Sequence, residues 1–177
     1  GSARGRRIKV PAGEVRPSTD RLREALFSIL QHKVPGARVL DLYAGSGALG
    51  LEALSRGGAS ARFVDSSRKA CRTIEANLSD LSFRGAVTCR EVLPFLAGET
   101  LEYDLILADP PYAKWGREDH AAALLAAEAL PRVLAEDGLL VVEVESEREE
   151  PPGGGWRLCD RRVYGSSALL FYQRDQG

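Results

Sequence analysis

Residues 37–50 read ARVLDLYAGSGALG, an apolar run followed by a glycine-rich turn. The apolar run predicts a buried strand, and the spacing of apolar residues after the turn predicts a helix over residues 47–57. Between them, Gly45, Gly47 and Gly50 form a G-x-G-x-x-G pattern. Glycines at such a junction permit a tight turn and let a ligand approach the backbone at the helix N-terminus. The stretch therefore predicts a ligand-binding strand–turn–helix unit.

Two carboxylates flank this unit. Asp65 ends the next expected strand, about 20 residues after Gly45, a spacing that suits a carboxylate on a ribose hydroxyl. Asp41 lies just inside the end of the first strand. Its negative charge suits the cationic amino-acid part of S-adenosylmethionine and is a poor neighbour for the pyrophosphate of NAD. S-adenosylmethionine is therefore the cofactor that the residues favour, with NAD as the alternative.

A second informative stretch is DPPY, residues 109–112, which closes the apolar run 105–108. Proline lacks an N–H donor and cannot extend a central strand, so the strand must end here. The Asp109 carboxylate and the Pro110 carbonyl then offer two acceptors to an exocyclic amine of a nucleobase, and Tyr112 offers a ring for stacking. Two accepted hydrogen bonds favour the pyramidal, nucleophilic form of the amine. The alternative is a strand that merely ends in a proline-rich turn.

These carboxylates share one position relative to the expected sheet. In doubly wound sheets, ligands bind beyond the carboxyl ends of the strands. Asp41, Asp65 and Asp109 all fall at such ends. One crevice is therefore expected to collect them, and together they predict methyl transfer.

The rest of the chain alternates expected strands and helices, which predicts an α/β fold with a parallel sheet and helices on both faces. Capping oxygens at residues 18–20 predict an amphipathic helix that ends near residues 35–36. An Ala/Leu-rich segment predicts one long helix over residues 118–135. The other expected elements are strands 37–43, 60–65, 85–90, 103–108 and 138–144, helices 67–80 and 92–97, and a C-terminal hairpin of 156–163 with 168–174.

Length and composition set the broad class. The chain has 177 residues, 44% hydrophobic and 28% charged, which suits one soluble globular domain. No apolar run approaches the ~18 to 20 residues of a membrane span, and no signal peptide is visible, so a cytoplasmic location is expected. We also expect a monomer. Gly1 and Ser2 are expected to be a cloning remnant.

No metal site is predicted. Cys71, Cys89 and Cys159 lie far apart and lack metal-ligand spacing, so buried thiols are expected. His32 and His120 are isolated, and we expect surface or packing roles for them.

Charge is segregated along the chain, although the formal net charge is only −1. A protein that coats nucleic acid indiscriminately needs an excess of Lys and Arg, so that class is disfavoured. We expect one basic face on RNA and one solvated acidic face; a merely solvated basic arm is the alternative. The basic residues are Arg4, Arg6, Arg7, Lys9 and Arg16, and the acidic stretch contains Glu143, Glu145, Glu147, Glu149 and Glu150.

The order of these motifs resembles the RsmD-like guanine-N2 methyltransferases of small-subunit (16S) ribosomal RNA. The resemblance covers nearly the whole chain, and its most specific parts are RPSTDR at residues 16–21 and AGSGALGLEA at residues 44–53. It implies a class I methyltransferase fold, S-adenosyl-L-methionine as donor, and methylation of one guanine amine during ribosome assembly. The implied partner is the small ribosomal subunit or its rRNA.

The resemblance also implies roles for individual residues. Arg16 and Thr19 would help close the cofactor pocket, and Asp109 and Tyr112 would hold the base. After the third strand the family tends to place Asp or Asn near the adenine; Glu91 takes that role here, with a solvated glutamate as the alternative. The cofactor residues are thus Arg16, Thr19, Asp41, Ala44, Gly45, Ser46, Gly47, Asp65, Ser66, Glu91 and Asp109, and the catalytic residues are Asp109, Pro110 and Tyr112.

Mechanism and domain organisation follow from this assignment. The sulfonium is already a strong electrophile, so the protein mainly aligns the amine with the methyl group, without metal or covalent intermediate. We expect a basic arm at residues 1–17 and one S-adenosylmethionine-dependent methyltransferase domain at residues 18–177. The alternatives are an adenine-N6 or cytosine-N4 DNA methyltransferase, or a non-catalytic RNA-binding ribosome assembly factor.

Overall fold

The computed structural model describes residues 17–113, 118–151 and 154–175. Most of the predicted basic arm, including Arg16, lies outside the described residues. Within the described ranges, no helix has both the length and the apolar character needed to cross a membrane.

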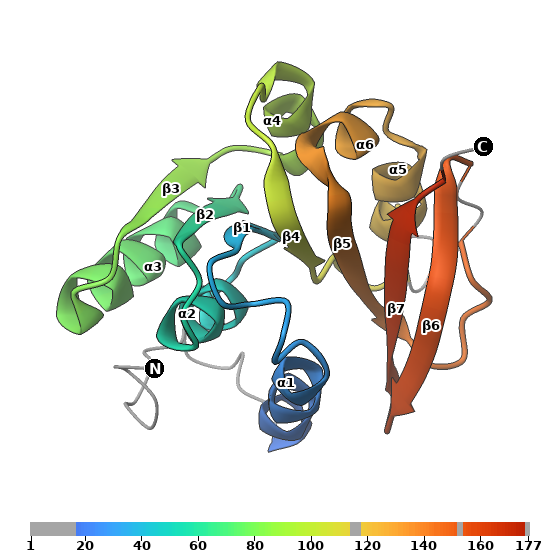
Figure 1. Cartoon of the computed structure of the whole chain (residues 1–177), viewed down its shortest axis with the longest axis horizontal. Coiled ribbons are helices and arrows are strands. Elements are labelled where there is room, and N and C mark those ends of the chain that lie inside the picture. The colour runs from blue at the N-terminus through green and yellow to red at the C-terminus, as the bar shows by residue number, and fades with distance from the viewer. Residues whose placement is uncertain (1–16, 114–117, 152–153, 176–177) are drawn as a thin grey trace.

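The described strands form one seven-stranded sheet in the order β3-β2-β1-β4-β5-β7-β6 (Figure 1). Strands β1 to β5 pair in parallel, and β7 runs antiparallel between β5 and β6. The predicted parallel sheet with a C-terminal antiparallel hairpin is therefore confirmed. The strands are β1 (Arg38–Leu42), β2 (Ser60–Asp65), β3 (Gly85–Cys89), β4 (Tyr103–Ala108), β5 (Leu134–Glu145), β6 (Trp156–Tyr164) and β7 (Ser167–Arg174).

Helices cover both faces of the sheet, as predicted (Figure 1). One apolar cluster packs α1, α2 and α3 on one face, and a second packs α4, α5 and α6 on the other. Because side chains alternate along a strand, Val39 faces the first cluster and Leu40 the second. The helices are α1 (Pro17–Ile29), α2 (Ala48–Ser55), α3 (Arg68–Leu81), α4 (Val92–Gly98), α5 (His120–Ala126) and α6 (Ala129–Val133).

The predicted long helix over residues 118–135 is wrong, because the segment forms two short helices. Ala127 is extended, with φ −70° and ψ 120°, and separates α5 from α6. Pro131 explains the break: a proline fits the first turn of a helix but removes a hydrogen bond from a helix interior. The helix must therefore restart shortly before Pro131.

Predicted boundaries of two elements also shift. Helix α1 begins at Pro17, one residue before the expected capping segment at residues 18–20, and ends at Ile29, before the expected stop at residues 35–36. Proline suits a first helical position because its missing N–H has no partner there in any case. Strand β5 begins at Leu134, four residues earlier than predicted, with a register shift opposite residues 103–105 of β4.

Candidate functional site

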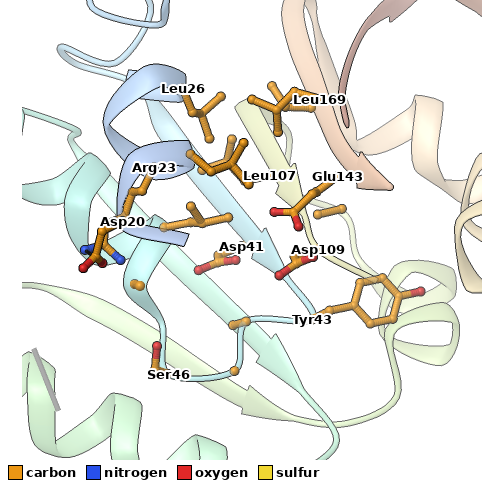
Figure 2. A pocket seen from close by; sticks show the side chains of 17 residues that line it. Asp20, Arg23, Leu26, Asp41, Tyr43, Ser46, Leu107, Asp109, Glu143 and Leu169 are labelled. Atoms are coloured by element: carbon orange, nitrogen blue, oxygen red, sulfur yellow. Dashed lines mark hydrogen bonds and ion pairs between the residues drawn. The ribbon is translucent and has the colours of Figure 1, made fainter. Parts of the chain in front are cut away.

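A cavity of about 210 Å³ opens where the carboxyl ends of β1 and β4 meet α1 and the start of α2 (Figure 2). The strand order reverses between β1 and β4, so the cavity lies at the topological switch point of the sheet. β5 and β7 complete the wall opposite the glycine turn. Of the predicted site residues, the lining includes Asp41, Ala44, Gly45, Ser46 and Asp109.

The glycine turn has the backbone that its sequence predicts. Gly45 and Gly47 have φ angles of 58° and 82°, in the left-handed region that favours glycine. A Cβ at Gly45 would meet no atom within 4 Å, so this part of the backbone faces open space. A Cβ at Gly50 would overlap the buried Phe63 ring. Gly45 therefore leaves room for a ligand, whereas Gly50 lets α2 pack closely on β2.

Asp41 is buried beneath this turn, with 1% of its surface exposed. Its Oδ2 accepts a hydrogen bond of 3.0 Å from the N–H of Gly50, the third residue of α2. Asp41 thus caps the helix from the neighbouring strand, since Gly47 at the N-cap has no side chain to do so. Burial raises the pKa of Asp41 well above its ordinary value; the Gly50 N–H opposes this rise, and the charges of Asp109 and Asp65 add to it. A cation in the cavity would stabilise the ionised form.

Asp65 joins the end of β2 to the glycine turn. Its Oδ2 accepts from the N–H of Gly45 at 2.9 Å, and its Oδ1 accepts from the N–H of Ser67 at 2.8 Å. Each carboxylate oxygen has a second lone pair, so these bonds are compatible with further bonds to ribose hydroxyls. Asp65 therefore supports the turn itself, a role that its spacing alone did not predict.

Four further predicted cofactor residues are Ser66, Glu91, Gly47 and Thr19. Ser66 is exposed between β2 and α3, and Glu91 is exposed at the N-cap of α4 without a side-chain capping bond. Gly47 lies at the end of the turn, where a Cβ would come within 3.0 Å of Ile74. Thr19 lies in α1. Within the described part of the chain, Ser66, Gly47 and Glu91 do not line the cavity; the side chain of Thr19 lies outside that part.

The DPPY turn leaves the end of β4 as predicted. Asp109 is exposed and lines the cavity, whereas Pro110 is buried. The Tyr112 hydroxyl lies 2.8 Å from Ser167 Oγ and donates to Glu143 Oε2 at 3.3 Å. Burial is the main cause of a raised pKa of Tyr112. The hydrogen bond with Ser167 opposes this rise, and the negative charges of Glu143 and Asp109 add to it. The tyrosine is therefore tied to β5 and β7, beside the cavity and outside its lining.

Glu143 is a pocket residue that the sequence analysis missed. We assigned it to a solvated acidic face, but its side chain is partly buried and lines the cavity (Figure 2). Alternation along β5 places Glu143 on the same face as Val141, toward α1. The missed signal was a carboxylate inside the otherwise apolar run of residues 139–144.

Tyr43 is a second missed residue. It lines the cavity with a φ of 56°, uncommon for a residue with a side chain, and it packs edge-on to His120 with ring centroids 6.1 Å apart. Burial, with smaller contributions from Glu118 and Glu91, raises its pKa to about 12. His120 thus has the packing role expected of it.

Helix α1 supplies a polar edge to the cavity. Arg23 Nη2 lies 3.1 Å from Asp20 Oδ1, and Arg23 Nε lies 3.8 Å from Glu52 Oε1 on α2. Both Asp20 and Arg23 line the cavity. The RPSTDR segment therefore leads directly into this edge.

Cysteine placement corrects one expectation. Cys71 is buried, but Cys89 and Cys159 are exposed, so the prediction of buried thiols is wrong for two of the three. In the described ranges, no group of three His, Cys, Asp or Glu side chains is arranged to hold a metal ion.

Comparisons with known proteins point in one direction. A family model described as conserved hypothetical protein 95 matches residues 1–173. The chain is 36% identical over 178 residues to "Ribosomal RNA small subunit methyltransferase D" of Escherichia coli strain K12, covering 99% of this chain and 88% of that protein. It is 36% identical over 181 residues to "Putative rRNA methyltransferase YlbH" of Bacillus subtilis, covering 98% and 96%. The solved structure "Putative methyltransferase yhhF from Escherichia coli" superposes with a TM-score of 0.84 at 36% identity, covering 100% of this chain and 96% of that one.

Proposed function

The chain belongs to the conserved hypothetical protein 95 family, the RsmD-like family that its motifs resemble, and from this premise we propose that it methylates the exocyclic N2 amine of a guanine in small-subunit rRNA. It is a methyltransferase, and S-adenosylmethionine is its methyl donor. The observation that carries the proposal is the meeting of the glycine turn, Asp41 and Asp109 in one cavity.

The residues present suit S-adenosylmethionine. The buried Asp41 carboxylate is a partner for the ammonium group, and the open side of Gly45 leaves space for the amino-acid part. Asp65 would accept from the ribose hydroxyls while holding the Gly45 N–H. Ala44, Ser46 and Gly47 complete the turn, and Arg16, Thr19, Ser66 and Glu91 are proposed to complete the cofactor site.

When bound, the cofactor supplies an electrophilic methyl group on a sulfonium. Asp109 and the Pro110 carbonyl are proposed to accept hydrogen bonds from the guanine amine, which localises its lone pair on nitrogen and orients it toward the methyl. The methylated nitrogen becomes acidic and loses its proton after transfer, so Asp109 need not be a strong base. Tyr112 is proposed to stack on a base turned out of its helix or loop.

The rRNA substrate is proposed from the relatives, since two that align over nearly the whole chain are named as rRNA methyltransferases. With a net charge of −1, the chain has little general attraction for nucleic acid. A basic arm at residues 1–17, ahead of a methyltransferase domain at residues 18–177, would supply local phosphate contacts. We propose that the protein acts as a monomer on the small ribosomal subunit or its rRNA.

Radiolabelled methyl transfer tests this function. Small subunits from cells without the enzyme are incubated with labelled S-adenosylmethionine, and the rRNA is then digested to nucleosides. The proposal expects label in N2-methylguanosine. Label in N6-methyladenosine, N4-methylcytosine or protein would overturn the assignment, and no label would favour a non-catalytic assembly factor.

A further inference from the structure

Two carboxylates on neighbouring strand segments lie at the same level of the sheet, one just after β4 and one within β5. Ala108 of β4 pairs with Val142 of β5, so the residues that follow them, Asp109 and Glu143, lie side by side. Both line the cavity, and Figure 2 shows both side chains directed into it. The acceptor turn therefore has a second carboxylate beside it, contributed by a strand that the DPPY motif does not contain.

The Glu143 carboxylate is held in place by two hydroxyl groups. Tyr112 Oη and Ser167 Oγ each lie 3.3 Å from Glu143 Oε2, and they lie 2.8 Å from each other. The three side chains come from the DPPY turn, β5 and β7, so the contact links three separate segments. Partial burial limits competition from water. Glu143 is thus an oriented hydrogen-bond acceptor.

An oriented carboxylate can distinguish bases that an amine-binding turn cannot. The Asp109–Pro110 pair would accept from the amine of guanine, adenine or cytosine alike. Next to that amine, guanine carries an N1–H donor, whereas adenine and cytosine carry a ring nitrogen with a lone pair. A carboxylate only accepts hydrogen bonds, so it attracts the guanine edge and repels the other two.

We propose that Glu143 accepts a hydrogen bond from the N1–H of the target guanine and so selects guanine as the base that is methylated. This inference rests on the proposed function, because it assigns the base specificity of the same cavity. Tyr112 and Ser167 act as positioning residues that hold Oε2 and aim the carboxylate at the base.

A single base analogue isolates the N1–H. 2-Aminopurine retains the exocyclic N2 amine but has a lone pair at N1 and lacks O6. After the methylated nucleotide has been mapped, small subunits are reconstituted with rRNA that carries guanosine or 2-aminopurine riboside at that position. Single-turnover methyl transfer is then compared for the wild type, Glu143→Gln and the control Glu145→Gln, which changes a partly buried glutamate on the same strand outside the cavity lining.

The wild type is expected to prefer guanosine by roughly 10-fold or more, because 2-aminopurine leaves the carboxylate facing a lone pair. Glu143→Gln places an amide that can donate to that lone pair, so the preference should fall toward one or invert. Glu145→Gln should keep the wild-type preference. The missing O6 affects all three proteins alike, so a change in the preference reports the N1 contact.

Three results would overturn the role of Glu143. The first is a wild-type enzyme that does not distinguish the two substrates. The second is a Glu143→Gln variant that transfers methyl groups to both substrates more slowly by the same factor, which would mean that Glu143 only positions Tyr112. The third is a Glu143→Gln variant with weakened S-adenosylmethionine binding in calorimetry, which would assign Glu143 to the cofactor.

A second variant covers the case in which Glu143→Gln does not fold. Ser167→Ala retains the carboxylate but removes one of the groups that aim it, so the guanosine preference should fall by a smaller factor; an unchanged preference contradicts the proposal. The two proposals can also fail separately. Absence of N2-methylguanosine from the wild-type reaction overturns both, whereas N2-methylguanosine with an unaltered preference in both variants overturns only the role of Glu143.

Discussion

The candidate site, which comprises the cavity and the residues beside it, has two halves, and they are held by different kinds of contact. The cofactor half, which contains Asp41, Asp65 and the turn at residues 43–47, is held by hydrogen bonds from backbone N–H groups to buried or half-buried carboxylates. The acceptor half, which contains Asp109, Tyr112, Glu143 and Ser167, is held by contacts between side chains. In the cofactor half, the groups that would bind the ligand also hold the fold together.

Because of this difference, we expect substitutions in the two halves to have different effects. Substitutions in the cofactor half should lower the free energy of unfolding and cofactor affinity together. Substitutions in the acceptor half should change methyl transfer while leaving both quantities nearly intact. The following variants test that separation, starting with the largest expected effect.

Asp109→Asn should produce the largest change, and only in the reaction. The carboxylate is exposed, so an amide of the same shape should leave the fold unaltered. Loss of an acceptor that binds the amine in the transition state should slow single-turnover transfer by about 100-fold or more, with cofactor affinity unchanged. Asp137→Asn, at an exposed carboxylate outside the cavity lining, is the control. Transfer at the wild-type rate would reduce DPPY to a strand terminator.

Gly50→Ala should damage fold and cofactor binding together. Its Cβ would overlap Phe63 and lie 3.1 Å from Asp41 Oδ2, so α2 must move away from β2. We expect a loss of about 1 to 3 kcal/mol in the free energy of unfolding, measured with denaturant, and weaker S-adenosylmethionine binding. Gly98→Ala, whose Cβ would meet no atom within 4 Å, should cost nothing comparable. A stable Gly50→Ala protein with normal affinity would contradict the coupling.

Asp65→Ala should show the same coupling at a smaller scale. The substitution removes the acceptor of the Gly45 and Ser67 N–H groups as well as the proposed ribose contacts. Calorimetric titration should show S-adenosylmethionine affinity weaker by about 1 to 2 kcal/mol, and the free energy of unfolding should fall by roughly 1 kcal/mol. Unchanged cofactor affinity would remove Asp65 from the site. An unchanged free energy of unfolding would show that the glycine turn is stable without the Asp65 hydrogen bonds.

Tyr112→Phe should have the smallest effect. It keeps the ring and removes the hydroxyl that contacts Glu143 and Ser167, so transfer should fall by only about 3- to 10-fold. Tyr112→Ala also removes the proposed stacking, worth about 1 to 3 kcal/mol, and should weaken productive RNA binding further. Equal rates for the two variants would assign the whole contribution of Tyr112 to its hydroxyl.

Several parts of the fold could be predicted because neighbouring residues specify them. The expected strands at residues 60–65 and 103–108 match β2 and β4 at both ends, since the apolar residues at 63–64 and 105–108 are followed directly by polar ones. The glycine turn and its left-handed φ angles also follow from a local motif. The predicted helix over residues 118–135 failed because the Ala/Leu-rich composition was given more weight than Pro131.

Local patterns likewise brought Asp41 and Asp109 to one edge of the sheet, because parallel strands place their carboxyl ends together. Which side chains meet there depends on register between segments far apart in the chain. Tyr112 contacts Glu143 and Ser167 across 31 and 55 residues, and no spacing in the sequence records that pairing. The sequence therefore specified a methyltransferase sheet with its glycine turn and acceptor turn. Only the packing of β4, β5 and β7 placed Glu143 in the cavity wall beside Tyr112 and Ser167, because strand register and packing decide what lies opposite a carboxylate.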